Sequence, residues 1–261
     1  MAFRKIADLR TIVTGASSGI GRELAIELAK HGARLVITAR RADRLDDLRK
    51  TLKSLGRDAI AVAGDIVEPA TQNAIVAASV QEFGGLDALI NNAGIGALGP
   101  FALADESRLR QVMEVNFFAP VELIRIALPE LQKSRHPIIV NVSSVLGHRA
   151  VANKSEYCAS KFAMHGFSDA LRCELAGDGI DVLVVSPSTT SSEFFDRAID
   201  GDDQSAARAK DGMSPRVVAR KIVRAMRNGK HEIILSFGGK SLVWLDRLCP
   251  PFMNRVLARF R

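Results

Sequence analysis

The stretch TGASSGIG, from Thr14 to Gly21, decides the fold of this chain. An apolar run, RTIVTG at residues 10–15, leads directly into it, and a helix-length segment with apolar residues at helical spacing follows it. Gly15 permits a tight turn, Gly19 lets a phosphate come close to the backbone, and Gly21 lets the helix pack on a sheet. A strand, a glycine-rich turn and a helix in this order are typical of the first unit of a doubly wound α/β sheet.

The same turn is a candidate anion site. The first amides of a helix have no partner within the helix, and the helix dipole adds partial positive charge there. The spacing is G-x-x-x-G-x-G, not the commoner G-x-G-x-x-G of dinucleotide sites. The alternative is an ordinary turn in which Ser17 or Ser18 caps the helix. The turn residues that we predict to contact a cofactor are Gly15, Ser17, Ser18, Gly19, Ile20 and Gly21.

Short apolar runs alternate with amphipathic helix-length segments over the first two-thirds of the chain. Strands that are apolar at successive positions must be covered on both faces, and this alternation predicts a parallel sheet with right-handed crossovers. We predict one doubly wound (Rossmann-type) α/β domain at residues 1–236 and an amphipathic basic extension at residues 237–261. The predicted strands are residues 10–15, 34–39, 58–64, 86–92, 137–144 and 181–187, with a seventh candidate at 232–236.

The composition is ordinary for a folded globular protein and unlike that of a disordered chain. The 261 residues are 47% hydrophobic and 25% charged. The N-terminus lacks the apolar core of a secretory signal, and no stretch approaches the roughly 18 apolar residues of a membrane-spanning helix. Three cysteines without disulfide-like spacing indicate a reducing compartment, so we expect a cytoplasmic protein. The five histidines are scattered, and the sequence predicts no metal site.

The net charge of +7 is concentrated at one end of the chain. Residues 216–261 contain eleven Lys or Arg and two acidic residues, whereas the preceding part is close to neutral. No groove-reading motif or aromatic platform accompanies the basic residues, so nucleic acid is not an expected partner.

The residues at the end of the second predicted strand help to distinguish an NAD site from an NADP site. An NAD site places Asp or Glu there to hold the ribose hydroxyls, whereas this chain reads TARR, ending in Arg40 and Arg41. A guanidinium at this point pairs well with a 2′-phosphate, so Arg40 predicts NADP. For Arg41 and Arg44 we favour the start of a solvated helix.

The only tyrosine, Tyr157, precedes Lys161 by one helical turn. A phenol has a pKa of roughly 10, and a nearby ammonium favours its phenolate. When protonated, the phenol can donate to a carbonyl oxygen as hydride arrives. Ser144 closes the fifth predicted strand and could hydrogen-bond the same oxygen. His148, in the loop between Ser144 and Tyr157, is expected to be solvated, with a place in the substrate pocket as the alternative.

These motifs, in order, resemble those of the short-chain dehydrogenase/reductases over about Leu9 to Phe195. For the catalytic residues, the resemblance implies that Tyr157 is the acid/base and that Ser144 positions the substrate oxygen. It implies that Lys161 lowers the tyrosine pKa and holds the nicotinamide ribose, and that Asn116, in EVNFF, holds a proton-relay water against that lysine.

The resemblance also assigns further cofactor contacts. Asp65, in GDI, matches the position that contacts adenine, and the NNAG motif closes the fourth strand beside it. The contacts predicted in this region are Asp65, Ile66, Asn92, Ala93 and Gly94. Tyr157 and Lys161 are expected to contact the cofactor as well.

The segment SPSTTSSEF departs from the family pattern after the sixth strand. Pro187 is kept, Ser188 replaces the usual glycine, and Ser192 stands where threonine is usual. We expect Pro187, Ser188, Thr190 and Ser192 to contact the nicotinamide, with weaker or reshaped binding. Phe194 and Phe195 follow as candidates for a lid over the substrate.

The C-terminal extension also departs from many members of the family. Phe252, Met253, Val256, Leu257 and Phe260 form one arc of a helix whose other side carries arginines. Residues 240–261 are expected to pack on the protein itself or a second subunit, or to lie on a membrane surface. Such extensions resemble those of hydroxysteroid and retinol-type reductases.

The sequence therefore predicts an NADP(H)-dependent carbonyl reductase or alcohol dehydrogenase. Its substrate would be a small ketone or secondary alcohol, more plausibly lipophilic than sugar-like. Family resemblance favours a homodimer or homotetramer. One alternative is 3-oxoacyl-carrier-protein reductase, and another is a regulator that binds nicotinamide without catalysis. The complete set of catalytic residues argues against the second, because a binder needs neither the serine nor the tyrosine.

Overall fold

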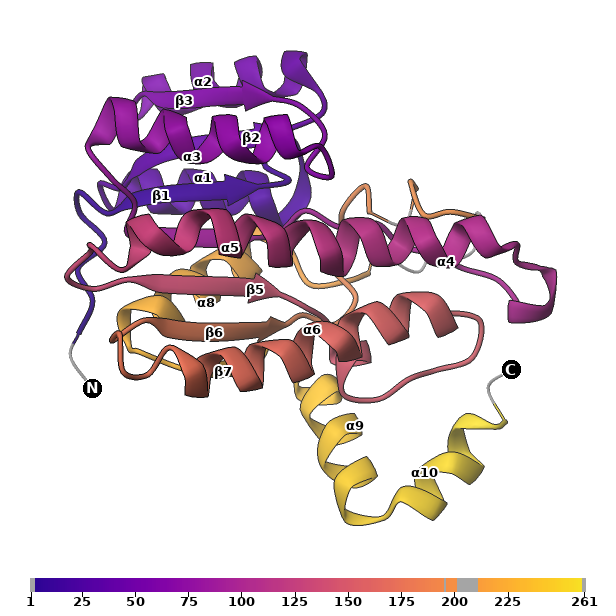
Figure 1. The fold of residues 1–261 in the computed structure, drawn as a ribbon. Helices are drawn as coiled ribbons and strands as arrows, with labels where there is room; N and C mark the ends of the chain where they lie inside the picture. Colours follow the sequence, from indigo (N-terminus) through magenta and orange to yellow (C-terminus); the bar gives the residue numbers. More distant parts are fainter. Residues whose placement is uncertain (1–2, 195, 201–210, 260–261) are drawn as a thin grey trace.

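The computed structural model describes residues 3–194, 196–200 and 211–259. Its centre is a seven-stranded parallel sheet in the order β3-β2-β1-β4-β5-β6-β7 (Figure 1). The six predicted strands and the seventh candidate are all confirmed. The strands are β1 Arg10–Thr14, β2 Arg34–Ala39, β3 Ala59–Ala63, β4 Ala88–Asn91, β5 Ile138–Val142, β6 Asp181–Ser186 and β7 Glu232–Ile234.

Helices cover both faces of this sheet (Figure 1). The α-helices are α1 Gly19–Lys30, α2 Ala42–Ser54, α3 Pro69–Phe83, α4 Glu106–Met113, α5 Ala119–Leu131, α6 Ser155–Glu174, α8 Pro215–Arg227, α9 Phe237–Leu248 and α10 Pro250–Leu257. Two 3₁₀ turns, η1 Phe101–Leu103 and η3 Val145–Gly147, and one π-helical turn, η2 Glu114–Phe118, complete the regular structure of the residues that the model describes.

Successive residues of β1 pack against opposite layers. Val13 belongs to a core shared with α1, α2 and α8, whereas Ile12 belongs to a second core shared with α3, α5 and α6. Both side chains are fully buried. Strands that are buried on both faces consist of continuous apolar runs, and this is why the strands could be predicted from the sequence.

The order of the strands determines where a ligand can bind. The chain builds β1, β2 and β3 towards one edge and then returns to the middle, where β4 pairs with the other side of β1. In an open parallel sheet, a crevice forms at the carboxyl ends of the strands that flank such a reversal. The glycine-rich turn after β1 lies at this point.

The last two helices lie outside the two layers and extend away from the sheet (Figure 1). Val243 of α9 and Met253 of α10 are buried, whereas Phe252 is 53% exposed. The apolar arc predicted for the extension therefore faces two environments, and its member Phe260 lies outside the described residues. Among the described helices, none is long and apolar enough to cross a bilayer.

Candidate active site

A cavity of about 410 Å³ opens at the carboxyl ends of the central strands. Its walls include the glycine-rich turn, the ends of β2, β4 and β5, the part of α6 that carries Tyr157 and Lys161, and the segment after β6. The structure thus brings the predicted site residues together: apart from Gly21 and Asn116, all of them line this one cavity.

The glycine-rich turn fits a bound phosphate. A Cβ on Gly21 would lie 2.4 Å from the carbonyl oxygen of Gly15, and one on Gly15 would lie 2.9 Å from the Cα of Ala93. The turn is therefore pressed against the end of β4. Ser18 precedes α1 without capping it, which leaves the first amides of α1 free of a side-chain acceptor. This open helix start suits the pyrophosphate of a dinucleotide.

A threonine that the sequence reasoning did not single out holds the turn to β4. The hydroxyl of Thr14 accepts hydrogen bonds from the backbone amides of Asn92 and Ala93 at 2.9 and 3.0 Å. The Asn92 side chain in turn donates to the carbonyl oxygen of Thr14 at 2.9 Å. A buried polar residue at the end of an apolar strand was the available signal.

Of the two arginines after β2, Arg40 lines the cavity as predicted, whereas Arg41 does not lie as predicted. Arg41 is not a solvated helix residue: it donates to the hydroxyls of Ser17 and Ser18 at 3.0 Å each and pairs with Glu193 at 3.0 Å. Arg40 also lines the cavity, but its side chain is 64% exposed and lies 3.8 Å from Asp65. Both guanidiniums are therefore beside the cavity, and Arg41 is the one anchored to the glycine-rich turn.

Tyr157 and Lys161 lie one turn apart on α6, with the Lys161 ammonium 5.6 Å from the centre of the Tyr157 ring. Burial raises the pKa of Tyr157 to about 12, and a weaker opposing effect comes from its hydrogen bond with Ser144. The net shift is opposite to the one that the sequence predicted from the lysine charge. Burial also lowers the pKa of Lys161 to about 8. The ammonium donates to the carbonyl oxygen of Val142 at 3.2 Å.

Asn116 lies behind the cavity wall, in the π-helical turn η2. Its side-chain oxygen accepts from the Ile95 amide at 2.8 Å, and its nitrogen donates to the Ile95 carbonyl at 2.9 Å and to the Ser160 hydroxyl at 3.0 Å. Asn116 thus fixes the strand end that carries Gly94 and Ile95. π-Helical turns are frequent at functional sites, where they displace one residue from the helical register.

The segment after β6 forms one wall of the cavity. Ser188, Thr190 and Ser192 all line it, and the Ser192 Cβ packs against the open side of Gly19. Phe194 adds an aromatic wall, because its ring lies edge-on to Tyr157 with centres 5.7 Å apart. The second lid candidate, Phe195, lies outside the described residues.

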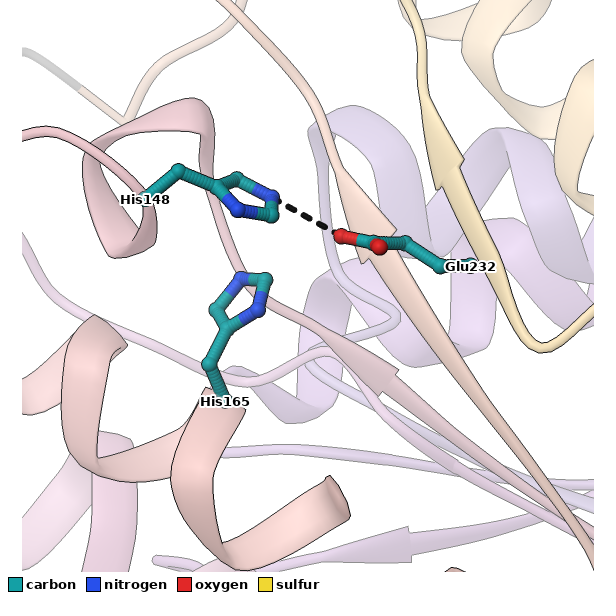
Figure 2. Close-up of side chains that lie close together, drawn as sticks. All are labelled: His148, His165 and Glu232. Carbon is teal, nitrogen blue, oxygen red and sulfur yellow. Dashed lines mark ion pairs between the residues drawn. The ribbon is translucent and has the colours of Figure 1, made fainter. Parts of the chain in front are cut away.

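His148 is neither solvated nor part of the cavity wall. Its side chain is 6% exposed, and its Nε2 lies 2.9 Å from a carboxylate oxygen of Glu232 on β7. Both expectations for this residue were wrong. The 3₁₀ turn η3 directs the ring away from the cavity and towards β6 and β7 (Figure 2).

Comparison with known proteins agrees with this arrangement. The short chain dehydrogenase family profile matches residues 10–202. Dehydrogenase/reductase SDR family member 7B of Bos taurus is 33% identical over 261 residues, covering 95% of this chain and 79% of that protein. Ketoacyl reductase HetN of Nostoc is 34% identical over 256 residues, covering 95% of this chain and 88% of that protein.

Solved structures show the same fold. A short chain dehydrogenase from Burkholderia cenocepacia in complex with NADP is 30% identical, with a TM-score of 0.78, over 88% of this chain and 96% of that one. A short chain dehydrogenase/reductase from Burkholderia phymatum in complex with NAD is 23% identical, with a TM-score of 0.89, over 95% and 96% of the two chains. This chain therefore belongs to the short-chain dehydrogenase/reductase family of oxidoreductases.

Proposed function

We propose that the protein is an NADP(H)-dependent oxidoreductase that interconverts a ketone and a secondary alcohol, with Tyr157 as the acid/base. One observation carries the proposal. The side chains of Ser144, Tyr157 and Lys161 line the same cavity as the glycine-rich turn, so a nucleotide on that turn and a substrate at the tyrosine would share one space.

A nicotinamide bound in this cavity would supply or accept the hydride, and the chain would supply the proton and a place for the substrate oxygen. Because burial raises the pKa of Tyr157 to about 12, the phenol carries its proton at neutral pH and can donate it to a carbonyl oxygen. Ser144, which hydrogen-bonds with the phenol, would hold the same oxygen in position. The Lys161 ammonium would stabilise negative charge on the phenolate left behind.

The preference for NADP rests on charge beside the turn. Arg40 and Arg41 both line the cavity, and a fork of guanidinium N–H groups suits a phosphate monoester. Glu193 already pairs with Arg41, and it would weaken phosphate binding unless that pair opens. Nicotinamide cofactors of both kinds occur among the structural relatives, so the two arginines are the basis of the proposal.

A lipophilic substrate is consistent with the wall near Tyr157, which includes Val145, Leu146, Val151 and Phe194. A second candidate is reduction of a 3-oxoacyl thioester, which the similarity to a protein named ketoacyl reductase favours. The two candidates differ in substrate and share the hydride and proton transfers, so one panel of substrates tests both.

The test is NADPH oxidation with a panel of ketones, aldehydes, steroid-like ketones and an acetoacetyl thioester, repeated with NADH. We expect turnover that prefers NADPH and falls by about a hundredfold or more in Tyr157→Phe, the range of general acid catalysis. Arg41→Ala should lower the ratio of turnover with NADPH to turnover with NADH, without abolishing turnover with NADH. Turnover that Tyr157→Phe leaves unchanged would contradict the role of Tyr157, and a preference for NADH would contradict that of the arginines.

We further propose that residues 1–236 form the catalytic unit and that residues 237–261 dock it. Among the exposed large apolar side chains, Phe118 and Phe162 lie on elements that carry the site, η2 and α6, and would suit a homodimer or homotetramer interface. Trp244 and Leu248, on α9, would suit peripheral contact with a membrane from the cytoplasmic side.

A further inference from the structure

Two of the five histidines, which are scattered in the sequence, come together with a glutamate in the fold (Figure 2). His148 follows η3, His165 lies on α6, and Glu232 begins β7. One ligand atom from each of the three residues lies within 4.8 Å of those of the other two. Four separate elements converge here, because Ser186 at the end of β6 also contacts both rings.

The distances between these atoms fit the spacing of ligands around one metal ion. The Nε2 of His148 lies 2.9 Å from the Glu232 carboxylate and 3.1 Å from the Ser186 hydroxyl, while the Nε2 of His165 lies 3.4 Å from that hydroxyl. Ligand atoms held at 2.0–2.1 Å around a tetrahedral zinc ion lie roughly 3.3 Å apart. The Nε2–H of His148 can donate to Glu232 while the Ser186 hydroxyl donates to the Nε2 of His165, so hydrogen bonds can pair these four atoms without an ion, and one cation could take the same four atoms as ligands.

The His165 ring packs directly against the backbone of Gly147. A Cβ on Gly147 would lie 2.4 Å from the His165 ring, so only glycine at the end of η3 lets this imidazole approach. Glu232 is the adaptable member of the group, because its side chain is 39% exposed and can rotate towards the rings.

We propose that His148, His165 and Glu232 bind a divalent transition-metal ion of the Zn²⁺ class, with the Ser186 hydroxyl or a water as the fourth ligand. Two imidazoles and one carboxylate are a ligand set that zinc uses, whereas Mg²⁺ and Ca²⁺ prefer oxygen ligands alone.

The ion has a structural role in this proposal. None of these four residues lines the cofactor cavity, so the ion would not touch the substrate. It would tie η3, which directly follows Ser144, to β6 and β7 at the base of the C-terminal helices. Gly239 of α9 lies against Val145 of η3, so the same tie would also steady the extension.

The test uses the full chain, stripped with a chelator and dialysed against low-micromolar Zn²⁺, with metal per chain measured by mass spectrometry. We expect about one Zn²⁺ per chain in the wild type and in His136→Gln, a matched change at an exposed histidine. His148→Gln and Glu232→Gln should each lose it. Zn²⁺ at a hundredfold excess over its Kd should also raise the Tm of the wild type by about 5 °C and leave those two variants unchanged.

Equal zinc content in the wild type and all variants would mean adventitious surface binding and would overturn the proposal. A wild type that takes up no zinc would overturn it as well. If His148→Gln fails to fold in the absence of metal, Glu232→Gln decides the question, because its change is at a partly exposed residue on an edge strand.

Discussion

Lys161 is a buried cation for which the surrounding protein provides little compensation. Its side chain is 5% exposed, and burial lowers its pKa from 10.5 to about 8. At neutral pH the folded protein therefore holds a charge that the unfolded chain leaves in water. Proteins often retain functional residues that lower the stability of the fold, because the activity needs those residues.

Replacing Lys161 by an apolar residue should lower the activity and raise the stability of the fold. We expect Lys161→Met to abolish turnover and to raise the free energy of unfolding at neutral pH by about 3 kcal/mol at most, the equivalent of the change in pKa. The gain should shrink as the pH rises from about 8 towards 10.5, because the wild-type lysine then loses its proton in the folded state. Urea denaturation of both proteins across this pH range measures it.

Lys240→Met, at an exposed position, is the control and should change neither activity nor stability. A Lys161→Met protein less stable than the wild type at neutral pH would show that the ammonium has favourable partners that offset its burial.

At the scale of elements, Arg108 joins α4 to the start of α6. Its guanidinium donates to Glu156 at 3.0 and 2.6 Å, to the carbonyl oxygen of Leu98 at 2.9 Å and to Asp200 at 3.0 Å. Arg108 and Glu156 are both 3% exposed. Burial works against the charged form of Glu156, yet hydrogen bonds from Ser155 and Arg108 hold its pKa below the usual value. Since Glu156 precedes Tyr157, this pair fixes the end of α6 that carries Tyr157.

Removing one member of the pair leaves the other charge buried and unpaired. We expect Arg108→Met to lower the free energy of unfolding by about 3–5 kcal/mol, measured by chemical denaturation at neutral pH. Arg110→Met on the same helix breaks an exposed pair with Glu106 and should cost under about 1 kcal/mol. Similar decreases in the free energy of unfolding for the two variants would mean that the buried pair contributes no more to stability than the exposed pair.

At the scale of the whole molecule, the C-terminal extension presents apolar side chains to solvent. Phe237 and Leu248 are 87% and 78% exposed, and Trp244 is 58% exposed. The same segment is basic in sequence, since residues 237–261 contain five Lys or Arg and one Asp. Apolar and basic side chains together suit an anionic lipid surface.

We expect the wild type to sediment with anionic vesicles and Leu248→Glu to bind them about tenfold more weakly, because the change removes apolar area and adds repulsion. Leu103→Glu, at a residue that is 83% exposed on the turn η1 and outside the extension, should bind as the wild type does. Equal sedimentation of both variants and the wild type, or none by the wild type, would contradict membrane docking.

The sequence by itself determined the sheet and the contents of the cavity. Strands covered on both faces must be apolar throughout, and a glycine turn pressed against β4 admits no side chain, so both features are written in local patterns. The pairing of Tyr157 with Lys161 could also be predicted from a local pattern, because one helical turn separates them.

Only the tertiary structure decided which arginine meets the phosphate turn, which way the Tyr157 pKa moves, and where His148 points. Each of these depends on contacts between residues far apart in the chain. Arg41 meets Ser17 and Glu193, burial outweighs the lysine charge at Tyr157, and His148 meets Glu232 across β6. Local periodicity carries no information on such distances, because the packing of whole elements sets them.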